Sequence, residues 1–489
     1  MPYDLLINVW KTMSLLRVFR YEATSLKNLE LSHSGRLHGS KPLLDYIQKK
    51  YRSVKEDSVP FKADHRFSRQ RWNQLPTNVP NPHSPQMKYI QMQTHTTNVP
   101  SRLKTPLLLP LGSTKLEPQE VSDRISGMIY GAAIGDAIGL ATRWMHPDES
   151  KFYYEKKDLT YSSILQDEHR VHWKPGDWTS NFDNLVLVLD SLIAWAGVVD
   201  ELDFAKRLKH WSKHGFPDLG DTTGIISSLT IKKVLQQKGF ERSPHTIAAT
   251  VVNQKTTSKN CENGDCAQKQ TDMPSGLISP LNEILDNDNA AIARASILGV
   301  IWNGCLSLSL FSPGPIFFRL LLCISKCHVA SGKAAVNSSI VLISHFCSPS
   351  GHHDLNCPEA VDAMLNTAAH HSGPHLKTDE HKKELKSILK INSLESLNVR
   401  EEGRMCHTYK PLGSAVLALK TTKGYKDFIS DLILEGGDSS SNACVAGALL
   451  GCRLGYQQLP SDWLSGLLTD QGNWLNVKVN SLLDMLGLP

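Results

Sequence analysis

Three stretches of the sequence combine acidic, hydroxyl-bearing and glycine residues at spacings that could support chemistry. They are GAAIGDAIGLATRW (131–144), KPGDWTSNFDNLVLVLDSL (174–192) and LEGGDSSSNACVAGALLGCRLGY (434–456). In the third stretch, Gly436 and Gly437 deliver Asp438 and three serines to the start of an apolar helix. A helix start carries unpaired backbone N–H groups and the positive end of the helix dipole, so it suits an acidic cap or a bound anion. Taken singly, each stretch is also typical of a turn followed by a helix cap.

In their order and spacing, the three stretches together resemble the ADP-ribosylglycohydrolase family, which includes ADP-ribosylarginine hydrolases. The family pattern is GDALG followed by an acidic residue, then GDWTDDT, then GGDTDTNAAIAGALLGA near the end. Further similar segments are HGFPDLGDTTG (214–224), NAAIAR (289–294), YKPLGSAVLAL (409–419) and LPSDWLSGL (459–467). The resemblance extends from about residue 120 to residue 489.

The resemblance implies an all-α fold with a dinuclear Mg²⁺ site. In the family, hydroxyls and carboxylates of the Thr-Asp-Asp and Asp-x-Asp-Thr runs hold the metals, which orient the ribose and an attacking water. This chemistry is reasonable because Mg²⁺ prefers hard oxygen ligands, which paired acids on two loops supply. The implied partner is ADP-ribose or an ADP-ribosylated protein, with the ADP-ribose joined through an N- or O-glycosidic bond.

Position by position, the resemblance assigns roles to individual residues of this chain. The metal positions are Thr179, Asp438, Ser440 and Ser441. The substrate-binding positions are Gly135, Asp136, Arg143, Trp178, Asn289, Arg294 and Gly437. For catalysis we single out Asp438, together with Asp183, which follows Thr179 by one helical turn.

The sequence departs from the family pattern at most of the carboxylate positions. Ser180 and Asn181 replace the two acids of GDWTDDT, Ser440 replaces the second acid of the last motif, and Arg143 occupies the acidic position of the first. One or two carboxylates hold a hydrated Mg²⁺ weakly and cannot offset two divalent cations in one pocket. We therefore predict a degenerate magnesium site in a catalytically inactive or impaired protein that retains binding of ADP-ribose or a related nucleotide.

Two other functions stay open from the sequence. A working hydrolase would rebuild a one-metal site from Asp438, Asp183 and Asp177. A structural or scaffold protein would keep the fold alone, since a fold does not determine a function. Arg143 could also face a diphosphate, because a guanidinium binds phosphate well.

The elements that position these residues are predicted to be helices. Glycines at 127, 131, 135 and 139 recur every four residues, which places them near one helix face and lets another helix or a ligand approach closely. Apolar helical segments follow at 185–199, 225–237, 290–302, 338–346 and 441–456, and alternating strand patterns are nearly absent. We predict an all-α, ADP-ribosylglycohydrolase-like orthogonal helical domain over residues 119–489.

Residues 1–118 differ in character from the rest of the chain. They carry 18 Lys and Arg against 8 Asp and Glu, a net charge of +10, in Pro-containing text without a sustained hydrophobic period. We predict a basic, mostly disordered leader. Binding of nucleic acid by this leader is an alternative, but no interleaving of aromatic and basic residues marks a nucleic-acid motif.

The cysteine pattern and the apolar segments indicate in which cellular compartment the protein is expected. The ten cysteines form no regular framework, and Cys261 and Cys266 lack a second pair at zinc spacing, so we expect reduced thiols in an intracellular protein. The 24 uncharged residues between Arg294 and Arg319 are interrupted by Pro-Gly-Pro, which favours two buried helices over a membrane span. We expect a cytoplasmic location, with a mitochondrial presequence in the first twenty residues as the alternative.

Overall fold

The computed structural model describes residues 116–155, 158–197, 200–253, 289–306, 330–347, 357–376 and 378–489. All of them belong to the larger of two compact units, Leu75–Pro489. Several sequence predictions lie outside the described residues: the disordered leader, the Cys261–Cys266 pair and the Pro-Gly-Pro break.

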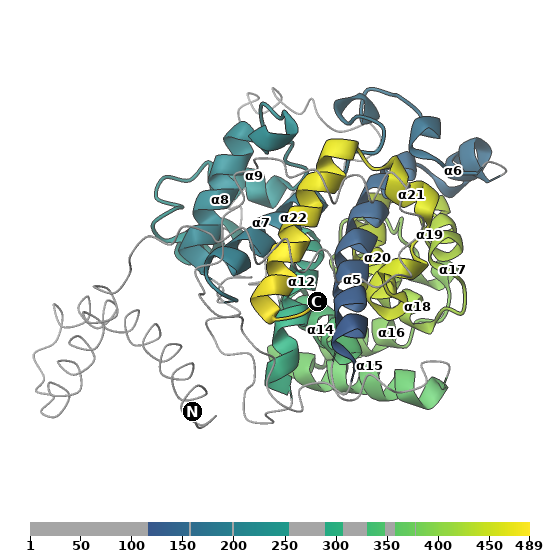
Figure 1. The fold of residues 1–489 in the computed structure, drawn as a ribbon. Helices are drawn as coiled ribbons and strands as arrows, with labels where there is room; N and C mark the ends of the chain where they lie inside the picture. Colours follow the sequence, from purple (N-terminus) through teal and green to yellow (C-terminus); the bar gives the residue numbers. More distant parts are fainter. Residues whose placement is uncertain are drawn as a thin grey trace, which may run out of the picture. The chain divides into compact units, whose positions relative to one another are not determined.

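Every regular element among the described residues is helical (Figure 1), which confirms the all-α prediction. The α-helices, in chain order, are α5 (Pro118–Gly139), α6 (Pro147–Tyr154), α7 (Ser180–Ala194), α8 (Glu201–His214), α9 (Leu229–Leu235), α10 (Pro244–Asn253), α12 (Ala290–Leu306), α14 (Ala330–Cys347), α15 (Pro358–Ser372), α16 (Asp379–Leu389), α17 (Leu394–Leu397), α18 (Tyr409–Lys420), α19 (Tyr425–Leu434), α20 (Ser439–Leu454), α21 (Ser461–Gly466) and α22 (Thr469–Leu486).

Most of the predicted helical segments correspond to one of these helices. The segment 225–237 is an exception, because its helix, α9, is restricted to Leu229–Leu235. The physical reason is a cap, since the Ser228 hydroxyl accepts a hydrogen bond from the backbone N–H of Ile231 at 3.2 Å. A side-chain acceptor of this kind starts a helix at the following residue and leaves the preceding residues outside it.

Among the described residues, the most extensive contact between two helices is that of α5 with α20, which lie side by side in Figure 1. The predicted glycine face of α5 is the contact surface. A Cβ atom added at Gly131 would lie 2.3 Å from the carbonyl oxygen of Gly447, and one added at Gly135 would lie 2.1 Å from that of Ala443. Glycine is therefore required at these positions because the two backbones touch. This contact brings the C-terminal end of α5 against the N-terminal end of α20.

Burial inside the protein accounts for the apolar composition of α5. The stretch Pro118–Thr142 is long and apolar enough to cross a membrane, and 94% of its most apolar window is buried inside the protein. Around the central pair, α18 and α19 pack on α20, and α12 packs on both α7 and α14.

Replacing Gly131 with alanine is expected to lower the free energy of unfolding by about 1–3 kcal/mol, because the new methyl group would overpack a backbone–backbone contact. Urea unfolding at equilibrium measures the loss. Gly472→Ala on α22 is the matched control. A Cβ atom there meets nothing within 4 Å, so alanine should be neutral or stabilise by up to about 1 kcal/mol. Equal effects of the two substitutions would contradict the close α5–α20 contact.

Candidate functional site

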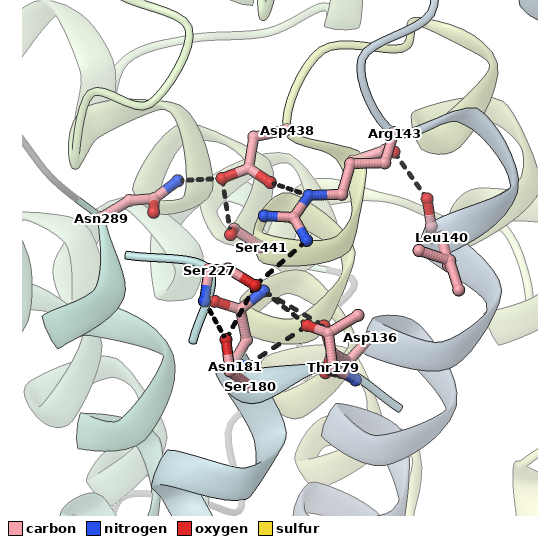
Figure 2. Close-up of polar contacts among 12 residues, drawn as sticks. Asp136, Leu140, Arg143, Thr179, Ser180, Asn181, Ser227, Asn289, Asp438 and Ser441 are labelled. Carbon is pink, nitrogen blue, oxygen red and sulfur yellow. Dashed lines mark hydrogen bonds and ion pairs between the residues drawn. The ribbon is translucent and has the colours of Figure 1, made fainter. Parts of the chain in front are cut away.

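Asp136 joins α5 to the start of α7. Its side chain is fully buried and accepts four hydrogen bonds (Figure 2). The donors are the backbone N–H of Thr179 at 2.7 Å, the Thr179 hydroxyl at 2.9 Å, the Asn181 side-chain amide at 3.2 Å and the backbone N–H of Phe182 at 3.2 Å. Burial raises the pKa of Asp136 to about 6, although these hydrogen bonds act to lower it. Asp136 therefore caps α7 from a different helix.

Asp438 collects donors from three separate segments at the N-terminus of α20. One carboxylate oxygen accepts from Nε of Arg143 at 3.1 Å. The other accepts from the Asn289 side-chain amide at 2.7 Å and from the Ser441 hydroxyl at 2.7 Å (Figure 2). Arg143 and Asp438 are both almost fully buried, at 4% and 3% side-chain exposure, so this is a buried ion pair.

Two backbone hydrogen bonds, here called the backbone lock, join the loop of Trp144 and Met145 to the loop of Gly437 and hold this ion pair in place. The N–H of Trp144 donates to the carbonyl of Gly437 at 2.8 Å, and the N–H of Gly437 donates to the carbonyl of Met145 at 3.3 Å. Gly437 has φ +70°, and a Cβ atom there would lie 2.7 Å from the carbonyl oxygen of Val399. Only glycine combines that φ with so close an approach. The two glycines predicted to form a loop before Asp438 therefore fix its position against the segment that carries Arg143.

Arg170 holds the same segment through hydrogen bonds to its backbone carbonyls. This residue lies in the 3₁₀ helix η3 (Arg170–His172) and is 3% exposed. Its guanidinium donates to the carbonyl oxygens of Leu140 at 2.9 Å, Ala141 at 3.1 Å and Arg143 at 2.7 Å. The sequence contained no signal for this role, because one arginine in a polar stretch resembles any surface residue.

Ser180 and Ser227 connect the residues bonded to Asp438, here called the Asp438 group, with those bonded to Asp136, the Asp136 group. The Ser180 hydroxyl donates to the Ser227 hydroxyl at 2.9 Å and accepts from the Ser227 backbone N–H at 3.2 Å. Nη1 of Arg143 in turn donates to the Ser227 hydroxyl at 3.4 Å. Ser180 thus lies at the predicted site, while Ser227 was missed, since it lies in a segment predicted only as part of a helix.

Asp183, Asp177 and Trp178 form a further group on the α7 side. The indole N–H of Trp178 donates to Asp183 at 2.9 Å, and the Gln471 amide of α22 donates to Asp177. Burial, followed by the negative charge of Asp177, raises the pKa of Asp183 well above its usual range. Burial also raises the pKa of Asp177 to about 6. The structure therefore places Asp183 with Trp178 and Asp177, and Asp438 with Arg143.

Replacing Asp183 with asparagine is expected to flatten the fall of stability with pH. The folded state keeps a proton on Asp183 above the ordinary pKa of 3.8, so it binds more protons than the unfolded chain, and the free energy of unfolding falls as pH rises through that window. Asparagine carries no titrating group but still accepts from Trp178. The variant should therefore gain stability relative to the parent as the pH rises above the ordinary pKa of 3.8.

Denaturant unfolding across that pH range measures this gain. Asp470→Asn, at an exposed position of α22, is the control for removal of a surface carboxylate. An Asp183→Asn variant whose stability runs parallel to that of the parent would show that Asp183 is ionised in the folded protein.

The remaining predicted positions are buried as well. Gly135 contacts the α20 backbone, and Arg294 on α12 is fully buried and donates to the carbonyl of Ala290 at 2.8 Å. Trp178 packs edge-on against Phe182, with ring centroids 4.8 Å apart. The Ser440 hydroxyl is buried and makes no hydrogen bond within the described part of the chain. The described residues also contain no group of three or more His, Cys, Asp or Glu side chains that could hold a metal ion.

Comparison with known proteins decides the family. The model of the ADP-ribosylglycohydrolase family matches residues 117–487. This chain belongs to the ADP-ribosylglycohydrolase family. A 54-residue stretch is 39% identical to a protein of Acanthamoeba polyphaga mimivirus named as an ADP-ribosyl glycohydrolase, covering 11% of this chain and 16% of that protein. A solved structure titled "ADP-ribosylglycohydrolase-related protein complex" aligns over 75% of this chain and 99% of its own, with 15% identity and a TM-score of 0.44.

In this member of the family, the residues that the resemblance assigns to one site come from the C-terminal part of α5, from the loop that follows it and from three helix starts. Asp136 and Thr179 meet at the α7 start, Asp438 and Ser441 lie at the α20 start, and Asn289 immediately precedes α12. The site presents hydroxyls, amides and one guanidinium. Its two central carboxylates, those of Asp136 and Asp438, accept hydrogen bonds from other groups of the protein.

Proposed function

We propose that this ADP-ribosylglycohydrolase-family protein is not a magnesium-dependent hydrolase and that its site binds ADP-ribose or a related nucleotide without a metal. The observation that carries the proposal is the contact of the Arg143 guanidinium with Asp438 at 3.1 Å, in a place where both side chains are buried. Arg143 stands where the family pattern has an acid, and it supplies the positive charge that a metal would otherwise bring.

The donors around Asp438 argue against a cation there. Mg²⁺ needs nearly octahedral oxygen ligands at short range and gives up its water reluctantly. Both oxygens of Asp438 already accept hydrogen bonds, one from Arg143 and the other from Asn289 and Ser441. A divalent cation would have to displace these donors and would be repelled by the guanidinium in a site of low dielectric constant.

Asp136 is committed in the same way. It accepts from the backbone N–H and the hydroxyl of Thr179 at the α7 start, and both donors would lose their partner if the carboxylate turned toward a metal. A rebuilt one-metal site is likewise unsupported, because Asp183 and Asp177 form hydrogen bonds with Trp178 and Gln471 and not with the Asp438 group. What the site retains is a set of hydroxyl, amide and guanidinium donors suited to sugar and phosphate oxygens.

Two assays of the full chain test this proposal. The first follows release of ADP-ribose from an ADP-ribosylated arginine protein, with an active family hydrolase as the positive control. The second is isothermal titration of ADP-ribose in millimolar Mg²⁺ and again in chelator. We expect no release, and binding that chelator does not change. Mg²⁺-dependent release that is lost in Asp438→Ala but kept in the exposed Asp379→Ala would overturn the proposal, and absence of binding would favour the scaffold function.

A further inference from the structure

The guanidinium of Arg143 has more donors than the protein uses. A guanidinium carries five N–H donors in a fixed plane. In the described part of the chain, Nε donates to Asp438 and Nη1 donates to Ser227, whereas Nη2 donates to no side chain or carbonyl. The residue as a whole is 4% exposed, but Nη2 is not one of the enclosed nitrogens that lack a partner, so it lies at the accessible edge of the guanidinium. The side chain is therefore suited to a second acceptor beyond Asp438.

The position of Arg143 is fixed before any ligand arrives. Its guanidinium stacks on the Trp144 ring, with 4.9 Å between the guanidinium carbon and the ring centroid. Its backbone carbonyl accepts from Arg170 at 2.7 Å. The next residue, Trp144, is held by Gly437 through the backbone lock. Because little freedom remains to be lost, a ligand that contacts this guanidinium meets a prearranged donor.

His169 supplies a second unused nitrogen, and the residue that follows it, Arg170, donates to the backbone carbonyl of Arg143 at 2.7 Å. Its Nε2 atom is buried and makes no hydrogen bond within the described residues. The charges of Arg143 and Asp438 both act on its ring, which also packs edge-on against Trp173 at 5.4 Å. Burial, reinforced by the charges of Arg143 and Arg170, lowers the pKa of His169 to about 4. The imidazole is thus neutral near pH 7 and can donate through one ring N–H.

We propose that Arg143 and His169 form a metal-free oxyanion subsite that accepts a phosphoryl group. The unused groups can all act as donors, and one of them carries a full charge, so the complementary ligand is an anion with several acceptor oxygens. Phosphoryl oxygens match the planar fork of a guanidinium, while a neutral hydroxyl would satisfy only one donor. The inference rests on the proposed function, since a bound Mg²⁺ would compete with Arg143 for the same anion.

Titration calorimetry of the full chain in chelator tests the subsite, with inorganic pyrophosphate, ADP and ADP-ribose as separate probes. We expect all three to bind. Binding of pyrophosphate as tight as that of ADP would identify the phosphoryl groups alone as the ligand, and tighter binding of ADP would identify a nucleotide. In Arg143→Gln, affinity for pyrophosphate should fall about tenfold or more, as expected for loss of a charged hydrogen bond.

Arg207→Gln is the matched control. This arginine lies on α8, is paired with Asp203 at 2.6 Å and is more exposed, so its loss should not change binding. If Arg143→Gln fails to fold, as judged by circular dichroism, His169→Phe provides a second test. Phenylalanine retains the packing on Trp173 but removes Nε2, and affinity should fall several-fold.

Two results would overturn the subsite: no binding of any probe to the parent chain, or unchanged pyrophosphate affinity in the folded variants. The outcome is separable from that of the proposed function. Mg²⁺-dependent release of ADP-ribose would remove the proposed function while leaving anion binding in chelator intact. Binding of pyrophosphate that is lost in Arg143→Gln would support the subsite whatever the hydrolysis assay returns.

Discussion

Replacing Arg143 with methionine is expected to lower the free energy of unfolding by about 3–5 kcal/mol. The substitution keeps an unbranched chain of similar length but removes the charge that faces Asp438 at 3.1 Å in a buried site. An uncompensated buried carboxylate is costly, even though Asn289 and Ser441 would still donate to it. Equilibrium unfolding in urea or guanidinium chloride measures the loss.

A double-mutant cycle separates the ion pair from the packing of the side chain. Asp438→Asn removes the opposite charge, so the variant carrying both substitutions has no buried charge at this place. We expect it to be more stable than Arg143→Met alone, with an interaction energy of about 1–3 kcal/mol. Strictly additive single effects would mean that Arg143 does not compensate Asp438. Lys382→Met, at an exposed ion pair with Asp379, is the control and should cost less than about 1 kcal/mol.

Replacing Asp136 with alanine has the second-largest expected effect. The substitution removes the acceptor of four hydrogen bonds and leaves the backbone N–H and the hydroxyl of Thr179 buried without an acceptor, whereas the Phe182 N–H keeps its bond to the Thr179 carbonyl. Each unsatisfied buried donor costs about 1–3 kcal/mol, so we expect a total loss of about 3–5 kcal/mol. The start of α7 should also become less ordered. We therefore expect faster amide hydrogen exchange at residues 179–183 in the variant than in the parent.

An ordinary helix cap provides the comparison for Asp136. Asp200 caps α8 by accepting from the N–H groups of Leu202 at 2.9 Å and Asp203 at 3.0 Å, at the protein surface. Asp200→Ala should cost about 0.5–2 kcal/mol, because water can replace its bonds. If Asp136→Ala costs no more than Asp200→Ala, the long-range cap between α5 and α7 is not the main role of Asp136.

Local sequence patterns determined a large part of this protein. The four-residue glycine spacing of 127–139 predicted a helix with one face open to close packing, since helical period and side-chain size are properties of neighbouring residues. The order of the three motifs identified the family that the match over residues 117–487 then showed. The identities of Ser180, Asn181, Ser440 and Arg143 also showed that expected carboxylates are replaced, because that requires only reading each position.

Only the tertiary structure decided which groups meet. Arg143 and Asp438 are 295 residues apart, and their pairing depends on the end of α5 lying against the start of α20. The motifs at 131–144 and 434–456 do not by themselves indicate which side chain Arg143 contacts. The contributions of Arg170, Ser227 and His169 were missed for the same reason, as each lies in a segment without a motif and acts through a contact made by packing. Residue types and local periods are encoded along the chain, whereas the partner of a buried charge is set by how distant helices approach one another.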